Sequence, residues 1–278
     1  MKKNPFEVRI ERMARQAKPS ESAKEATAPP PADLANLPAC ADHQRLCNNA
    51  LLRCALYSGR NKNTPRVYLK DAVIQSRGGV TVEYTGEELR QDDLTVFLQL
   101  VRLAKSSGVG AVVFNSYMIC GAVGLATNPA SYRRLKECLH RLQSGQVNIY
   151  TKENKGVVFS HIESFEWDGK VGDVQIVHLY MPRQLIELFK KNEYTHLNFK
   201  ERLDLPDGLA RWLHGYYSTH EYPFEVKTDT LLECAGISCE RRRDGRTLIK
   251  TALGKLEAVG FLKSSIIEGY LVKVERNL

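Results

Sequence analysis

Residues 128–162, NPASYRRLKECLHRLQSGQVNIYTKENKGVVFSHI, decide how the first half of this chain folds. Asn128 followed by Pro129 predicts a helix start, because asparagine caps free N–H groups and proline suits the first helical turn. This helix is expected to run to about Gln143. Two apolar segments then flank the polar tip at 152–155, as in a β-hairpin. A helix closed by such a hairpin indicates a winged helix, a variant of the helix-turn-helix.

The residues before this stretch predict the other parts of the same unit. The segment at 79–85 alternates like a strand, and Asp92 or Asp93 can cap a helix whose apolar stripe runs from Leu94 to Leu103. A short helix is expected at 117–125. Beyond the hairpin, 173–179 is predicted to be a strand and 181–189 a connecting helix.

The same order of elements recurs in the second half of the chain. Pro206 is expected to begin a helix over 205–217, and Thr228 to cap a short second helix. A third helix is predicted at 243–259, followed by a hairpin made of 261–267 and 270–274. We therefore predict an α+β protein with two tandem winged-helix domains, at 46–189 and 190–278, after a flexible N-terminal arm at 1–45.

Composition narrows the class of protein further. The 278 residues are 43% hydrophobic and 26% charged, which is typical of a globular protein. No apolar run reaches the roughly 18 residues of a membrane helix, and no apolar signal segment follows the first lysines, so we expect neither membrane insertion nor secretion. Seven cysteines without a C-x-x-C pair indicate reduced thiols in the cytoplasm. The net charge of +8 favours a polyanionic partner such as nucleic acid.

Basic residues gather on the third helix of each block. At 100° per residue, an apolar arc in the first block lies opposite a basic arc of Arg133, Arg134, Lys136, His140 and Arg141. In the second block, an apolar side containing Leu248 and Ile249 adjoins Arg242, Arg243, Arg246 and Lys250. A solvated basic face explains either helix alone. Their recurrence on the helix that a winged helix inserts into the major groove favours DNA contact.

Other possible sites are weaker. Lys152 and Lys155 at the hairpin tip suit phosphate contact, although charged hairpin tips are common. Cys40, His43, Cys47 and Cys54 do not have the spacing of a standard zinc module, and Cys47, Leu51 and Cys54 fit an apolar helical stripe better. No phosphate-binding G-x-x-x-x-G-K-[ST] motif and no H-E-x-x-H pair occurs. We expect no cofactor, no metal and no catalytic residue.

Four long strings give the chain a resemblance to a known family. They are 55–66 (ALYSGRNKNTPR), 84–93 (YTGEELRQDD), 136–143 (KECLHRLQ) and 217–224 (YSTHEYPF). Over about residues 55–278 the chain resembles the TrfA family of plasmid replication initiators. Arg133 and Arg134 depart from that family's third-helix pattern, whereas the residues that follow it are Tyr132, Lys136, Glu137, Cys138, Leu139, Arg141 and Leu142. Arg60, Lys62 and Arg66 lie in a matching string, where both phosphate contact and structural packing are open.

The resemblance implies an initiator that is not an enzyme. Such a protein binds direct repeats, or iterons, in double-stranded origin DNA and helps to open an adjacent AT-rich segment. The implied partners are the host replicative helicase, helicase-loading proteins and the polymerase sliding clamp, and the implied inactive form is a homodimer. The family's clamp-binding peptide has no match in 43–53. A winged-helix transcriptional repressor is the alternative, and a nicking relaxase or primase is a third reading.

Overall fold

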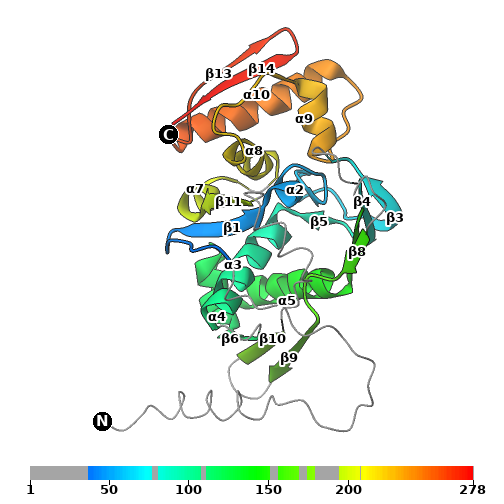
Figure 1. The fold of residues 1–278 in the computed structure, drawn as a ribbon, viewed down its shortest axis with the longest axis vertical. Helices are drawn as coiled ribbons and strands as arrows, with labels where there is room; N and C mark the ends of the chain where they lie inside the picture. Colours follow the sequence, from blue (N-terminus) through cyan, green and yellow to red (C-terminus); the bar gives the residue numbers. More distant parts are fainter. Residues whose placement is uncertain are drawn as a thin grey trace. The chain divides into compact units, whose positions relative to one another are not determined.

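The computed structural model describes residues 37–76, 81–107, 111–150, 156–168, 174–178, 194–206 and 208–277. All of them lie in one compact unit, Ala32–Leu278. Helices and strands are mixed along the chain, as predicted for an α+β protein (Figure 1). Buried apolar side chains form two clusters, one drawn from residues 37–199 and the other from residues 205–272.

The first cluster is built around several helices and short sheets. Its elements are β1 (Gln44–Asn48), α2 (Asn49–Leu52), β2 (Tyr57–Ser58), β3 (Tyr68–Ile74), β4 (Thr81–Glu87), β5 (Leu89–Arg90), α3 (Gln91–Ser107), β6 (Ala111–Asn115), α4 (Ser116–Ala122), α5 (Pro129–Ser144), β7 (Gln146–Tyr150), β8 (Gly156–Phe159), β9 (Ser164–Asp168) and β10 (Val174–His178). Strands β3, β4, β7 and β8 form a four-stranded antiparallel sheet in that order. A second sheet has the order β6-β10-β9.

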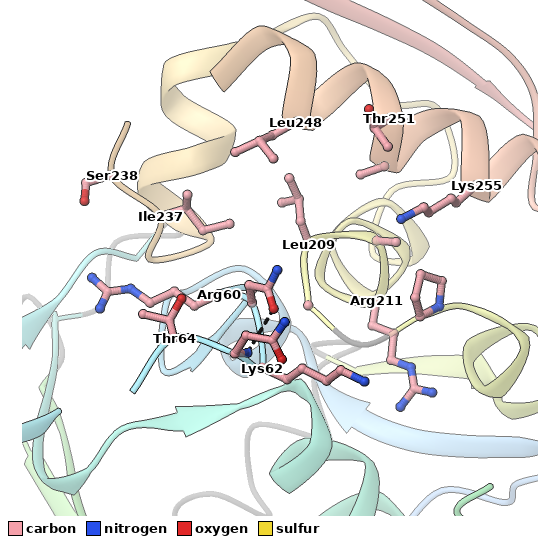
Figure 2. A pocket seen from close by; sticks show the side chains of 17 residues that line it. Arg60, Lys62, Thr64, Leu209, Arg211, Ile237, Ser238, Leu248, Thr251 and Lys255 are labelled. Atoms are coloured by element: carbon pink, nitrogen blue, oxygen red, sulfur yellow. Dashed lines mark hydrogen bonds between the residues drawn. The ribbon is translucent and has the colours of Figure 1, made fainter. Parts of the chain in front are cut away.

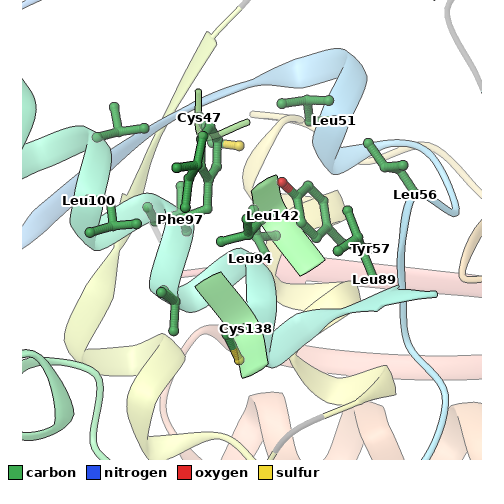
Figure 3. Close-up of a cluster of buried hydrophobic side chains, with 14 of the residues drawn as sticks. Cys47, Leu51, Leu56, Tyr57, Leu89, Leu94, Phe97, Leu100, Cys138 and Leu142 are labelled. Atoms are coloured by element: carbon green, nitrogen blue, oxygen red, sulfur yellow. The ribbon is translucent and has the colours of Figure 1, made fainter. Parts of the chain in front are cut away.

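Helices α3 and α5 pack their apolar faces into this cluster. Figure 3 shows Leu94 and Phe97 of α3 together with Cys138 and Leu142 of α5, close to Tyr57 of β2. All five side chains are buried. Truncating a buried leucine or phenylalanine to alanine typically costs about 2–5 kcal/mol, so this apolar face fixes how α5 is oriented.

Strand β11 (Tyr194–Asn198) and helix α7 (Phe199–Asp204) still contribute Leu197 and Phe199 to the first cluster. The second cluster lies among α8 (Leu209–Ser218), β12 (Val226–Lys227), α9 (Thr228–Cys234), α10 (Arg242–Ala258), β13 (Leu262–Glu268) and β14 (Leu271–Arg276). The hairpin strands β13 and β14 pair antiparallel, and β12 extends the sheet on the β14 side. Three helices followed by a hairpin are therefore present in the second half.

Strand pairing holds residues 194–198 against the first cluster, and buried polar contacts join the two clusters. Strand β1 pairs antiparallel with β11, from Gln44 opposite Asn198 to Asn48 opposite Tyr194. The fully buried guanidinium of Arg202 in α7 donates to Gln91 Oε1 at 2.9 Å and to Thr95 Oγ1 at 3.2 Å, both on α3. Trp212 of α8 donates to the Cys54 carbonyl at 3.1 Å. These contacts fix α3 against α7 and α8.

Most predicted elements are present, with shifted ends. Asn128 caps α5 as predicted, because its side chain accepts from the Ser131 amide at 2.9 Å. Helix α8 begins at Leu209, later than the Pro206 start that we predicted, and Thr228 is the first residue of α9 rather than its cap. The predicted connecting helix at 181–189 lies outside the described residues.

The predicted stripe of Cys47, Leu51 and Cys54 on one helix is wrong. Cys47 lies on strand β1, and only Leu51 belongs to helix α2. Both thiols are nevertheless buried, and burial raises the pKa of Cys47 and of Cys54 to about 12. They are therefore protonated members of the apolar core.

The apolar clusters divide between Phe199 and Leu205, whereas the sequence suggests a domain boundary at residue 189. Residues 179–193 are outside the described part of the chain, so the domain limits stay a prediction. Among the helices that the structure describes, none combines the length and apolar character needed to cross a membrane.

Candidate nucleic-acid interface

Helix α10 carries a row of basic side chains on its surface. Its buried arc includes Ile249, Leu253 and Leu256, which pack in the second cluster. Because successive residues rotate by 100°, this arc turns the other positions of the helix toward solvent. The four predicted side chains are all exposed: Arg242, Arg243, Arg246 and Lys250. The predicted basic face of α10 is thus available to a partner.

Two of these arginines lie beside the hairpin β13–β14. The Arg242 Nε atom is 3.2 Å from Asp229 Oδ2, and its guanidinium lies 5.6 Å from the ring centre of Tyr270. Arg246 Nη2 donates to the Ile267 carbonyl at 3.1 Å. The Arg242 side chain remains 71% exposed, so its ion pair with Asp229 is weak and leaves it open to another anion.

Leu248 was expected on the apolar side of α10, and this prediction is wrong. Its side chain is 46% exposed. It lines a groove that separates α10 from the segment 59–64 and the start of α8. The apolar arc of α10 is therefore narrower than the sequence pattern suggests.

Helix α5 presents a less basic surface than predicted. Arg133 and His140 are exposed, with Glu137 on the same arc, whereas Arg134 and Lys136 are half-buried. The His140 ring lies 4.9 Å from the ring of Phe165, in an edge arrangement. The exposed arc thus combines one arginine, one glutamate and one histidine.

Arg141 is not on the exposed face of α5, contrary to the prediction. It is 6% exposed, and its Nε donates to Asp93 Oδ1 at 2.9 Å. Burial alone lowers the pKa of an arginine, but the adjacent Asp93 carboxylate outweighs burial and raises the pKa of Arg141. A guanidinium held in this way stabilises the protein and is unavailable to DNA. The physical reason for the error is Asp93, which lies on α3 and is distant in sequence.

The start of α3 holds two more of the predicted cations. Arg66 Nη1 lies 2.7 Å from Asp93 Oδ2, and Arg66 Nη2 lies 2.8 Å from Asp92 Oδ1. Arg134 of α5 reaches Asp92 Oδ2 at 3.1 Å. Of the two readings left open for Arg66, the structure therefore supports packing. Desolvation opposes ionisation of Asp92, but Arg66 and Arg134 outweigh it and lower its pKa to about 2.

Asp92, Asp93 and Cys138 bring their ligand-type atoms within 4.8 Å of one another. A metal ion would be attracted to such a group in isolation. Here the guanidiniums of Arg66, Arg134 and Arg141 supply the positive charge. Burial also raises the pKa of Cys138, so its sulfur stays protonated. The cluster is an ion-pair network that ties α5 to α3 and to residue 66.

Arg60 and Lys62 lie on the loop after β2. Arg60 Nε donates to the Gly236 carbonyl at 2.8 Å and lies 3.6 Å from Glu88 Oε1, so this side chain joins the two halves. Lys62 is exposed. Lys152 and Lys155, predicted at the first hairpin tip, fall outside the described residues.

The sequence reading missed the groove beside α10. Its walls come from residues 59–64, from Pro206 and 208–211, and from Ile237, Ser238 and one side of α10, which are far apart in the chain (Figure 2). Lys255, on the wall formed by α10, was in none of the predicted sets. In the sequence, the string Arg60-Asn61-Lys62 was the one local indication of a binding surface here. The groove itself could not be predicted, because no sequence pattern brings its three wall segments together.

The chain matches known proteins over most of its length. The family model described as "TrfA protein" matches residues 14–276. The plasmid replication initiator protein TrfA of Escherichia coli is 28% identical over 247 residues, covering 84% of this chain. The chain spans 62% of the length of that relative.

Solved structures of a second protein share the fold. A crystal structure of domains 2 and 3 of RctB has a TM-score of 0.56 at 13% identity, covering 83% of this chain and 97% of that one. Another structure of RctB domains 2–3 has a TM-score of 0.53 at 14% identity, covering 80% and 95%. At these identities the likeness concerns the fold alone. The match of the family model to residues 14–276 shows that the chain belongs to the TrfA protein family.

Proposed function

We propose that this chain is a plasmid replication initiator that binds direct repeats in double-stranded origin DNA. The observation that carries the proposal is the exposed row of Arg242, Arg243, Arg246 and Lys250 along α10. Cations on one helix face can reach guanine edges and phosphates in a major groove. Membership of the TrfA family and the name of the Escherichia coli relative support the same function.

Each half of the molecule is proposed to be a winged helix. In the second half, α8, α9 and α10 precede the hairpin β13–β14, so α10 is the recognition helix. In the first half, α3, α4 and α5 precede β7 and β8, so α5 is the equivalent helix. Two such helices on one face of DNA would enter successive major grooves, about 34 Å apart.

The proposed reaction breaks no covalent bond. Initiators bound side by side bend and underwind the duplex, and their contacts offset the few kcal/mol that unstacking a flexible neighbouring segment costs. The host helicase, its loading proteins and the sliding clamp are proposed to act on the opened segment. A homodimer that does not bind the repeats is proposed as the inactive form.

Footprinting of the purified protein on its own plasmid tests the DNA-binding part. Protection of a set of direct repeats is the expected result, and a plasmid without any protected site would refute the proposal. Permanganate probing of a supercoiled origin then separates an initiator from a repressor with the same fold. Reactive thymines beside the repeats are expected of an initiator only.

Arg246 tests base reading by α10. Bidentate contact with a guanine is worth roughly 1–3 kcal/mol of discrimination, so Arg246→Ala should weaken binding to the repeat more than binding to random DNA. Lys200→Ala is the matched control, since Lys200 is an exposed cation on α7. Equal losses on both DNAs would mean that Arg246 contacts phosphate only.

A further inference from the structure

A groove of about 860 Å³ lies between the two halves of the protein. One wall is the loop 59–64, another is the start of α8, and the third is the side of α10 that carries Leu248, Thr251 and Lys255 (Figure 2). Among the lining residues that the structure describes, four are cations and none is an aspartate or glutamate. A groove with this lining attracts an anion.

The cations of the groove differ in how they are held. Arg60 is bound to the Gly236 carbonyl, and Arg211 donates to the Leu205 carbonyl at 2.9 Å, so these two charges are fixed in the walls. Lys62 and Lys255 are exposed, and they project from opposite walls, the loop and α10. The pair can therefore approach a ligand from two sides.

The groove also offers apolar surface. Leu209, Ile237 and Leu248 contribute to its lining, alongside the hydroxyls of Ser238 and Thr251. Such a mixture suits a sugar-phosphate backbone, because the deoxyribose rings are apolar and the phosphates accept hydrogen bonds from hydroxyls and amines. A small free anion would leave Leu248 exposed.

The groove continues toward the other recognition helix. A second hollow of about 450 Å³ shares Arg60, Lys62 and Gly208 with the groove and extends to Arg134 of α5. The two hollows together therefore connect α5 with α10. DNA that presented successive major grooves to these helices would place a stretch of backbone over the connection.

The walls of the groove are held close by backbone contacts. The Gly59 amide donates to the Ala235 carbonyl at 2.7 Å. Gly208 adopts a φ of +95°, and a Cβ atom there would lie 3.1 Å from the Gly59 carbonyl oxygen. The loop is thus bonded to the residue after α9 and lies close against the start of α8 before any ligand arrives, which reduces the entropic cost of binding.

We propose that this groove binds the DNA backbone between the two major grooves, with Lys62 and Lys255 contacting phosphates. The proposal rests on the DNA binding proposed above and identifies where the strand between the recognition helices lies. The proposal adds Leu248, Thr251 and Lys255 to the contact surface. These residues lie on the side of α10 that faces away from the hairpin β13–β14. These contacts are independent of sequence, so they contribute equally to binding of specific and random DNA.

The first experiment measures how the affinity for a random-sequence duplex depends on salt. Lys62→Gln, Lys255→Gln and the double variant are compared with wild type by fluorescence anisotropy between about 50 and 200 mM KCl. Each lost phosphate contact should reduce the slope of log K against log[salt] by about 0.9, which corresponds to roughly eightfold weaker binding at about 0.1 M salt. Lys200→Gln, an exposed lysine on α7 outside the groove, should leave the slope unchanged.

The second experiment locates the contact. Hydroxyl-radical cleavage is run on a duplex carrying one repeat from the origin footprint, with wild type and with the double variant. We expect wild type to protect the sugars that lie between the two DNA segments covered by the recognition helices. The double variant should lose this central protection and keep the protection of the two flanking segments. Cleavage of these central sugars as in free DNA, with wild type bound, overturns the proposal.

The outcomes separate the two proposals. If wild type binds no duplex at any salt concentration, the proposed function fails and the groove proposal fails with it. If the affinity of wild type for DNA falls strongly with salt, but the salt slopes of both lysine variants equal that of Lys200→Gln, only the groove proposal is overturned. Both lysines are exposed, so equal urea unfolding midpoints are expected and confirm that the variants are folded.

Discussion

His161 should make the stability of this protein strongly dependent on pH. Its ring is 1% exposed and is surrounded by the rings of Phe97, Phe159 and Tyr57, at centroid distances of 4.9, 5.5 and 5.5 Å. Neither ring nitrogen has a hydrogen-bond partner within the described residues. Burial therefore disfavours the charged form and lowers the pKa of His161 from 6.5 to about 3.

The sign of the effect follows from proton binding. The unfolded chain takes up a proton at His161 near pH 6.5, whereas the folded chain does so only near pH 3. Stability from this residue is thus complete above pH 6.5 and is lost as the pH falls toward 3. Between about pH 7.5 and about pH 5, the free energy of unfolding should fall by about 2 kcal/mol from His161 alone.

The measurement compares urea unfolding of wild type and His161→Phe at these two pH values. The variant removes the titrating group and fits the aromatic surroundings, so its loss of stability on acidification should be about 2 kcal/mol smaller than that of wild type. His161→Leu is a second variant in case the larger ring does not pack. His43→Gln, at an exposed position, should behave as wild type.

Parallel pH dependences of wild type and both His161 variants would refute this reasoning. Such a result would mean that water or a polar group satisfies the ring in the folded protein. His214 is also buried, and desolvation lowers its pKa despite its hydrogen bond to the Glu201 carboxylate. Because His214 is unchanged in every variant, its contribution cancels in the comparison.

Three further predictions concern internal contacts that hold the proposed DNA-binding surface in place. Arg141→Gln should destabilise the protein by about 3 kcal/mol in urea unfolding, because it removes a buried ion-pair partner of a carboxylate, whereas exposed Arg133→Gln should change stability by less than about 0.5 kcal/mol. Gly236→Ala should lower stability by about 1–2 kcal/mol, measured the same way, since φ is +69° and the new Cβ would lie 3.1 Å from Ser58 Cβ. Arg202→Met should lower the unfolding midpoint and weaken binding to a two-groove site more than to a half-site, because it releases α7 from α3; equal losses on both DNAs would count against a positioning role.

Local signals in the sequence predict the helices well and their partners poorly. The start of α5 could be predicted because Asn128 and Pro129 act within one turn of the helix. The burial of Arg141 could not, because Asp93 lies 48 residues earlier in the chain. On a helical projection Arg141 falls at the edge of the basic arc, where the pattern alone does not distinguish solvent from an ion pair.

The strands that join the two halves were missed for a similar reason. Residues 44–48, QRLCN, lack the alternation of a half-buried strand, and their partners are at 194–198. Strand β1 forms through tertiary pairing and not through local propensity. Leu248 is the opposite case, because its apolar character predicts burial whereas the adjacent groove leaves it exposed.

The two proposed recognition helices differ in the charge that they offer to DNA. The acidic pair at the start of α3 binds Arg134 and Arg141 of α5, while on α10 Arg243 and Lys250 remain exposed. Base reading is therefore expected mainly from α10, and α5 is held rigidly by the ion pairs that reduce its charge. A duplex that spans both helices therefore needs cations between them and a fixed distance from α5 to α10. The groove supplies the cations, and the buried Arg202 and the β1–β11 pairing supply the fixed distance.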